Sequence, residues 1–233
     1  MRLSKEEWDK SYERHENFIF YPKEEAVKFL NRFVRKRIAV DKFIDIIDFS
    51  KKPIRGLDFG CGIGRLAILM KEWGIDAYGI DISPYALKTA RELAAFLGFV
   101  DMRDKFILGN GTKLPFPKGY FDVVIAESVL DSMPISLARK LVTDIARVTK
   151  GVFFLSLISG DNSEHSREFA GEEKNKTSHE KGTIQSYYNW GKIHNLIAGT
   201  RFKIIWAQLI TSESLTSPYK YSRYYLVLKT RAA

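Results

Sequence analysis

The chain has 233 residues, of which 45% are hydrophobic and 13% aromatic, and its formal net charge is +9. This length and apolar content suit one α/β domain with a large core. No apolar run approaches the ~20 residues that span a bilayer, and charges stand where a signal peptide would have an apolar centre. We therefore expect a cytoplasmic protein without membrane contact. One cysteine excludes an intrachain disulfide, and four scattered histidines give no reason to expect a catalytic metal.

The first 50 residues combine aromatic side chains with many charges. Apolar residues recur on one face from Glu24 to Arg37, which predicts an amphipathic helix. The aromatic residues before it either anchor the segment on the core or line a binding site. Both interpretations stand for Trp8, whereas we favour a site role for Tyr12 or Tyr21.

A glycine-rich turn follows the first buried strand at residues 57–65 (Leu-Asp-Phe-Gly-Cys-Gly-Ile-Gly-Arg). Alternating glycines let the backbone approach a ligand closely. The helix predicted over 63–73 offers unpaired N–H groups and a positive dipole end to an anionic group. A dinucleotide fingerprint would need a third glycine at Arg65, so a nicotinamide-dependent oxidoreductase is disfavoured. Cys61 fits as a small residue between glycines rather than as a nucleophile.

An acidic residue ends the next predicted strand, which covers 76–82. Asp81 lies 21 residues after Gly60, close to the offset at which a carboxylate meets a ribose in such folds. Ile82 points the other way and offers an apolar face to a base. Ser83 followed by Pro84 predicts the cap of a helix over 84–97.

The second half of the chain continues the alternation of strands and helices. We predict strands at 121–128, 151–158, 202–210 and 223–229, the last two as an antiparallel pair, and a helix at 136–148. Residues 159–188 are polar and lack large aliphatic side chains until Ile184. We expect a structureless insert that acts as a lid over the substrate.

These segments together resemble the class I S-adenosylmethionine-dependent methyltransferases, distinctly over residues 55–158. The resemblance implies a doubly wound α/β fold with a mostly parallel seven-stranded sheet and a C-terminal antiparallel strand pair. It implies an N-terminal helical cap at 1–50, a cofactor-binding methyltransferase domain at 51–233, and an insert at 159–188 near the substrate. The implied cofactor is S-adenosyl-L-methionine, with S-adenosyl-L-homocysteine as the product.

The resemblance also assigns site residues. The implied cofactor-binding positions are Asp58, Gly60, Cys61, Gly62, Gly64, Asp81, Ile82, Asn110, Gly111, Glu127, Tyr12 and Tyr21. Asn110 stands where the family usually has aspartate, so its amide oxygen would accept from adenine without charge. Glu127 and Tyr21 are the candidate catalytic residues. Other candidates for a base, needed only if the acceptor keeps its proton, are Asp131, His15 and His165.

Three functions stay open. The first is methyl transfer to an O or N atom of a small molecule. The second is methylation of tRNA or rRNA, for which the densest basic patch comprises Arg32, Arg35, Lys36, Arg37, Lys51 and Lys52. Neither an Asn/Asp-Pro-Pro-Tyr motif nor an added RNA-binding module supports it. The third is cofactor binding without catalysis. A monomer or a homodimer fits each of them.

Overall fold

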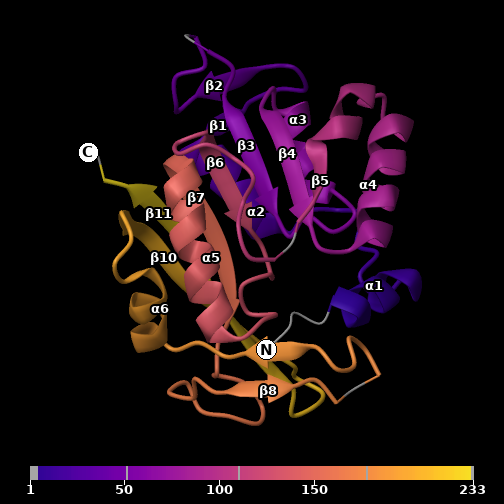
Figure 1. The fold of residues 1–233 in the computed structure, drawn as a ribbon. Coiled ribbons are helices and arrows are strands. Elements are labelled where there is room, and N and C mark those ends of the chain that lie inside the picture. The colour runs from indigo at the N-terminus through magenta and orange to yellow at the C-terminus, as the bar shows by residue number, and fades with distance from the viewer. Residues whose placement is uncertain (1–4, 51, 110, 177, 232–233) are drawn as a thin grey trace.

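A seven-stranded sheet with helices on both faces forms the centre of the computed structural model, which describes residues 5–50, 52–109, 111–176 and 178–231 (Figure 1). Its strands are β3 (Arg55–Phe59), β4 (Asp76–Asp81), β5 (Phe106–Leu108), β6 (Phe121–Ala126), β7 (Thr149–Ile158), β10 (Phe202–Glu213) and β11 (Lys220–Thr230). The helices are α1 (Lys5–Glu13), α2 (Glu24–Phe33), α3 (Arg65–Glu72), α4 (Pro84–Phe96), α5 (Ile135–Val148) and α6 (Trp190–Ile197), with a 3₁₀ turn, η1, at Val100–Lys105. Two short hairpins pair β1 (Arg35–Arg37) with β2 (Phe43–Asp45), and β8 (Glu172–Lys174) with β9 (Ile184–Ser186).

The strand order confirms the doubly wound fold. The sheet runs β10-β11-β7-β6-β3-β4-β5, and the five strands from β7 to β5 are parallel. Strand β11 is antiparallel to both β7 and β10, as expected for the terminal pair. The order reverses at β3, between β4 and β6. Ligands of open α/β sheets bind beyond the carboxyl ends of the strands at such a point.

Two apolar layers hold the helices on the sheet. Alternate residues of one strand face opposite sides, so Phe153 packs in the layer under α5 and α6, whereas Phe154 packs in the layer under α2, α3 and α4. Both side chains are fully buried. In the second layer the ring of Phe29 on α2 stacks on Phe154 at 4.9 Å. Helix α2 is therefore part of the core.

The described residues 5–50 are divided between two ends of the sheet and one of its faces. Figure 1 places α1 beyond the carboxyl ends of the parallel strands and the β1–β2 hairpin at the opposite end of the sheet. Because α2 packs on the sheet face, only the described residues 5–23 lie in the position expected of a cap. The assignment of that stretch as a cap over a ligand stays a prediction.

The helix predicted over residues 24–37 is too long. Helix α2 ends at Phe33, and the next residues form β1. Arg35 explains the change, because its guanidinium donates to Asp45 at 2.6 Å and to the carbonyl of Trp73 at 2.8 Å and lies over the ring of Phe43. These tertiary partners favour an extended backbone over another helical turn. The other predicted helices agree with α3, α4 and α5 to within two residues at each end.

The prediction that the insert at 159–188 is structureless is wrong. It contains the β8–β9 hairpin, which lies beside α1 below the carboxyl edge of the sheet (Figure 1). Ser186 fastens it to the loop after β6, since its amide donates to the carbonyl of Asp131 at 2.7 Å and its hydroxyl to that of Met133 at 2.6 Å. Hydrogen bonds of this kind cannot be predicted from the polar composition of the segment.

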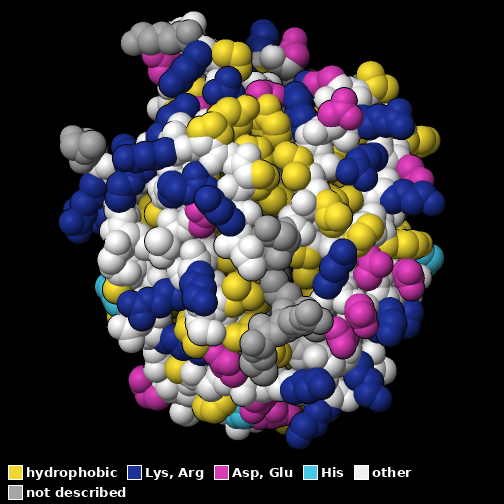
Figure 2. Space-filling model, in the orientation of Figure 1, with side chains coloured by type: hydrophobic (Ala, Val, Ile, Leu, Met, Phe, Trp, Pro, Cys, Tyr) yellow, Lys and Arg dark blue, Asp and Glu magenta, His cyan; other side chains and the backbone are white. Residues whose placement is uncertain are grey.

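Among the described residues, none forms a helix over the sheet face between α4 and α5, where the chain after β5 runs as a loop (Figure 1). Tyr78, Phe116 and Tyr120 pack together there, with ring centroids 5.6 to 5.9 Å apart. Figure 2 shows hydrophobic side chains gathered over this part of the face, with Lys and Arg side chains spread around them. Among the described residues, no helix is long and apolar enough to cross a membrane.

A substitution at Gly64 can test how tightly the start of α3 packs against its neighbours. Its φ is +85°, and a Cβ added there would lie 2.9 Å from the ring of Phe106. Gly98 has nearly the same φ, +84°, with no atom within 4 Å of such a Cβ. Gly64→Ala adds backbone strain and overpacking and is expected to lower the free energy of unfolding by about 2–5 kcal/mol. Gly98→Ala adds strain alone, about 1–2 kcal/mol. Urea unfolding measures both, and equal losses would contradict the packing account.

Candidate functional site

Two adjoining hollows, of about 730 and 900 Å³, open at the carboxyl ends of β3, β4 and β6. Five residues line both of them: Trp8, Tyr12, Gly60, Ser128 and Ser132. The first hollow is mostly apolar and the second mostly polar. We call them the apolar hollow and the polar hollow.

The glycine turn lies where the two hollows meet, since Gly60 lines both of them. Gly60 and Gly62 have φ values of +72° and +52°, which only glycine adopts without strain. The amides of Gly60 and Cys61 donate to the carbonyl of Ile80, and the amide of Gly62 donates to Oδ2 of Asp81 at 2.8 Å. The loop is thus bound to the end of β4. The hydroxyl of Tyr12 from α1 lies against Gly62, in the space that a Cβ would need.

Asp81 is the acidic group of the apolar hollow. Its other oxygen accepts from the amide of Ser83 at 2.9 Å. Burial raises the pKa of this carboxyl, and hydrogen bonds from the amides of Ser83, Gly62 and Ile82 oppose the rise. A carboxylate offers about four lone-pair sites, so capacity remains for a hydroxyl of a ligand in the hollow.

Asp58 holds the first turn of α3. Its Oδ2 accepts from the amide of Ala67 at 3.1 Å, one of the N–H groups left unpaired at a helix start. Burial raises the pKa of Asp58 to about 7, and both Arg65 and that amide limit the rise. Asp58 also lines the polar hollow. Its hydrogen bond with Ala67 stabilises the start of α3, directly after the glycine turn.

The far wall of the apolar hollow suits a flat ring. Ile82 and Gly111, both predicted from the sequence, line it. The apolar residues that complete the wall are Phe59, Ile80, Leu114, Val129, Met133 and Leu141. Asn110 lies outside the described residues, so its predicted contact with adenine stays a prediction.

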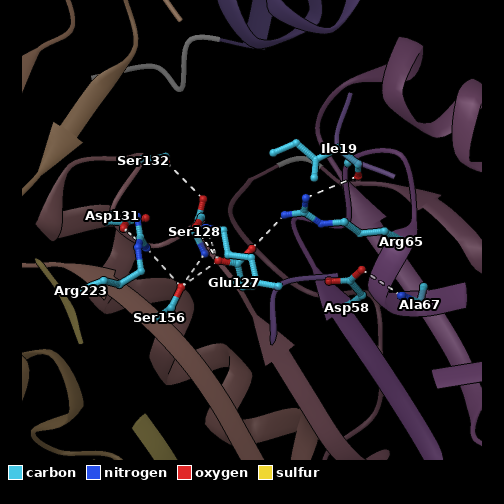
Figure 3. A network of polar contacts seen from close by, with 12 residues as sticks. Ile19, Asp58, Arg65, Ala67, Glu127, Ser128, Asp131, Ser132, Ser156 and Arg223 are labelled. Atoms are coloured by element: carbon cyan, nitrogen blue, oxygen red, sulfur yellow. Dashed lines mark hydrogen bonds and ion pairs between the residues drawn. The ribbon is translucent and has the colours of Figure 1, made fainter. Parts of the chain in front are cut away.

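Glu127 is the centre of the polar hollow. This buried carboxylate pairs with Lys23 at 2.8 Å and with Arg65 at 2.9 Å. Figure 3 shows Arg65 approaching it from one side and Ser156 and Arg223 from the other. Ser156 donates to Glu127 at 3.3 Å and accepts from Arg223 at 3.2 Å.

These charges decide the protonation of Glu127. Burial by itself would raise its pKa, but Lys23 and Arg223 outweigh burial and lower the pKa to about 2. Ser128, whose hydroxyl donates to Glu127 at 2.6 Å, favours the charged form too. A carboxylate with so low a pKa takes up almost no proton at neutral pH. The arrangement favours a fixed negative charge over a general base.

Tyr21 does not lie in the site. Its side chain is 84% exposed, and it is not among the described residues that line either hollow. The chain turns outward between α1 and α2, so the aromatic side chain faces solvent. The expected catalytic and cofactor-binding role of Tyr21 therefore needs correction. Tyr12 and Trp8, which lie 9 and 13 residues earlier on α1, line both hollows instead.

Other candidates for a base are also placed elsewhere. Asp131 is buried in an ion pair with Arg223 at 2.7 Å. His15 packs on the ring of Phe18, and His165 pairs with Glu173 at 3.1 Å. None of the three is among the described residues lining the hollows.

A metal site has one possible location within the described chain. Glu164, His165 and Glu173 of the insert bring potential ligand atoms within 4.8 Å of one another. Both glutamates are exposed, and such groups are common without an ion. The expectation of no catalytic metal stays a prediction.

Two residues of the glycine turn have packing roles. Gly64 begins α3 against Phe106 and Ala90 and is not among the described lining residues. Cys61 is buried, with its sulfur under Gly79 and its thiol directed at the carbonyl of Gly62. Burial raises the pKa of this thiol, which agrees with a small inert residue.

Sequence reasoning missed several charged and polar residues of the polar hollow: Asn17, Lys23, Arg65, Glu180, Gln185 and Arg223. Arg223 had a detectable signal, since it directly precedes the apolar run 224–228 of β11 and a charge in a buried strand needs a partner. For Arg65 the sequence indicated only that it occupies the position of a third glycine. Glu180 and Gln185 had no signal, because a polar insert gives no indication of which side chains face inward.

The depressed pKa of Glu127 predicts a pH-dependent stability. Because the folded pKa, about 2, lies below the ordinary 4.5, ionised Glu127 stabilises the fold fully above pH 4.5. This contribution is lost as the pH falls towards 2. Glu127→Gln is expected to lower the free energy of unfolding by about 3 kcal/mol at pH 7, with the deficit shrinking below pH 4.5.

Unfolding curves at a series of pH values measure this difference. The matched control is Glu92→Gln, because Glu92 is exposed and its lysine partner is 3.9 Å away. A constant deficit of the Glu127 variant from pH 7 to pH 2.5 would contradict the assigned charge state.

The comparisons with known proteins agree with this geometry. Residues 57–155 match the family model described as a methyltransferase domain. The chain is 32% identical over 148 residues to a probable tocopherol O-methyltransferase of Oryza sativa subsp. japonica, covering 60% of this chain and 40% of that protein. It is 26% identical over 191 residues to ajmaline N-methyltransferase of Rauvolfia serpentina, covering 78% and 64%. The chain thus spans less than two thirds of either relative.

Solved structures share the fold. A 1,6-didemethyltoxoflavin-N1-methyltransferase of Burkholderia thailandensis, with its substrate and S-adenosylhomocysteine bound, superposes with a TM-score of 0.68 at 15% identity over 98% of this chain and 87% of that one. An S-adenosylmethionine-dependent methyltransferase of Methanosarcina mazei superposes with a TM-score of 0.64 at 19% identity, over 79% and 96%. Residues 57–155 are thus similar to the methyltransferase-domain family, and the chain shares its strand order and overall fold with S-adenosylmethionine-dependent methyltransferases of known structure.

Proposed function

We propose that the protein transfers a methyl group from S-adenosylmethionine to an O or N atom of a small molecule. The observation that carries this is the junction of the two hollows above the glycine turn. The apolar hollow combines apolar lining residues with the carboxylate of Asp81, which suits an adenosine. The polar hollow offers fixed charges of both signs for an amino-acid tail, together with space beyond it for an acceptor.

The residues present fit this cofactor. Asp81 accepts from the ribose hydroxyls with its remaining lone pairs, and charge-assisted bonds of this kind are strong. Ile82 and Leu114 enclose the base. Glu127 attracts the ammonium of the amino-acid tail, while Lys23 and Arg65 attract its carboxylate.

The bound cofactor supplies a methyl group already activated by a sulfonium. The protein then needs to hold the acceptor in line, and orientation alone lowers a barrier by about 7–11 kcal/mol. Trp8 and Tyr12 on α1, with Gln185 on the insert, close the hollows against water. Glu127 is a positioning residue in this scheme, because its pKa of about 2 leaves it charged.

A small-molecule acceptor fits better than RNA. Arg35 and Arg37 bond Asp45 and the carbonyls of Trp73, Ala39 and Val40, so they stabilise the β1–β2 hairpin. That hairpin lies at the end of the sheet away from the hollows (Figure 1). On the face drawn in Figure 2 the basic side chains are dispersed rather than gathered in a stripe. The N- and O-methyltransferases among the relatives, named for small molecules, support the same choice.

Cofactor binding can be tested through the ribose carboxylate. Asp81→Asn removes the charge that receives the ribose hydroxyls, so its affinity for S-adenosylhomocysteine should fall about 10- to 100-fold, equivalent to about 1.4–2.8 kcal/mol. Titration calorimetry at fixed salt measures this loss. Asp104→Asn, at an exposed position on η1, should bind as the wild type does. Wild-type protein that binds neither the donor nor its product at millimolar concentration would overturn the proposal.

The acceptor class can be tested with labelled methyl donor and fractionated cell extract. Label should enter the low-molecular-weight fraction and persist after RNase treatment. Label that disappears with RNase would establish the RNA alternative. A protein that binds S-adenosylhomocysteine but labels no fraction would favour the non-catalytic alternative.

A further inference from the structure

The turn between β8 and β9 carries a glutamate that faces the polar hollow. Glu180 lines this hollow together with Glu127 and the glycine turn, although it lies in a polar insert far along the chain. Its side chain is 21% exposed. The carboxylate therefore borders the polar hollow on the side of the insert.

The backbone at Glu180 is held in an unusual conformation. Its φ is +54°, a left-handed value that costs a residue with a side chain about 1–3 kcal/mol. Its amide donates to Oε2 of Glu16 at 3.0 Å, and its carbonyl accepts from the amide and hydroxyl of Thr183 at 3.1 and 2.8 Å. Gly182 brings the same turn against Glu7 of α1. The contacts on both sides of the turn fix the direction of the side chain.

The charges around Glu180 differ from those around the other acids of the site. Lys23 and Arg65 pair with Glu127, and Arg223 pairs with Asp131. Glu180 has a hydrogen bond from Asn17 and an ion pair of 3.5 Å with His179, whose side chain is 57% exposed.

The surroundings also make Glu180 a better proton acceptor than Glu127. Burial raises its pKa, and the nearby charges of Asp131 and Glu16 add to the rise, whereas Asn17 and His179 oppose it. Tyr12 is the other titratable group facing it, on α1.

We propose that Glu180 is a catalytic residue that binds a nitrogen acceptor, an amine or a heterocycle with an N–H group. The inference rests on the proposed function and names the substrate class of the same site. Nitrogen that receives a methyl group gains positive charge, which a nearby carboxylate stabilises in the transition state. A phenolate acceptor carries negative charge already, and Glu180 would repel it.

The step balances without a further reactant. The nitrogen lone pair forms the N–CH₃ bond while the S–CH₃ bond breaks and its electron pair stays on sulfur. The N–H proton passes to the carboxylate of Glu180 and then to solvent. Neither an oxidant nor a metal enters the step.

The test uses the full chain saturated with S-adenosylhomocysteine. Arylmethylamines and the matching arylmethanols serve as paired probes, and ligand-observed NMR measures their binding to the wild type, Glu180→Gln and Glu173→Gln. Glu173 is the matched control, because it lies in the same hairpin and pairs outward with His165. Calorimetry measures S-adenosylhomocysteine binding to each variant, which reports whether the cofactor site is intact.

The wild type and Glu173→Gln should bind the amines at least 10-fold more tightly than the alcohols. Glu180→Gln should lose that preference while its affinity for S-adenosylhomocysteine stays within about twofold of wild type. With labelled donor, methyl transfer to amine acceptors should fall at least 100-fold in Glu180→Gln. A wild type without amine preference, or a Glu180→Gln variant that keeps it, would overturn the inference and leave the proposed function intact. Failure of the wild type to bind S-adenosylhomocysteine would remove both.

Discussion

The buried carboxylate of Glu127 imposes the strongest constraint on this structure. A charge removed from water must find partners in the protein, or its burial costs several kcal/mol. Lys23 comes from the segment before α2, Arg65 from α3, and Arg223 reaches it through Ser156 from β11. One acid at the end of β6 thereby ties three distant parts of the chain around a single point. That point borders the polar hollow at the end of β6, the strand next to β3, where the sheet order reverses.

The closure of the site follows from a second set of contacts. Helix α1 lies against the glycine turn through Tyr12, and the β8–β9 hairpin lies against the segment after α1 through Glu16 and Glu180. Neither element belongs to the sheet, and each is stabilised partly by the other. The hollows are therefore bordered by strand ends of the sheet on one side and by residues of α1 and of the β8–β9 hairpin on the other.

The local motifs were predictable because their chemistry depends on near neighbours in the chain. A ligand reaches a glycine turn between a strand and a helix from beyond the carboxyl end of that strand. The end of the next parallel strand lies beside the turn. Asp81, Ile82 and Gly111 therefore lie in the apolar hollow as expected. Tyr21 had no such constraint, and an aromatic residue in a loop faces the solvent as readily as the site.

The sequence by itself determined the doubly wound fold and the positions of the glycine turn and of Asp81 at the carboxyl ends of the strands, since hydrophobic periodicity and glycine spacing act over a few residues. Only the tertiary structure decided that α2 ends early, that the insert forms a hairpin, and that Glu127 is held ionised by cations from three segments. It also decided that Glu180 faces the site. Each of these involves tertiary contacts, such as those of Arg35 with Trp73, Ser186 with Asp131 and Glu180 with Glu16, and such contacts are set by how the layers pack.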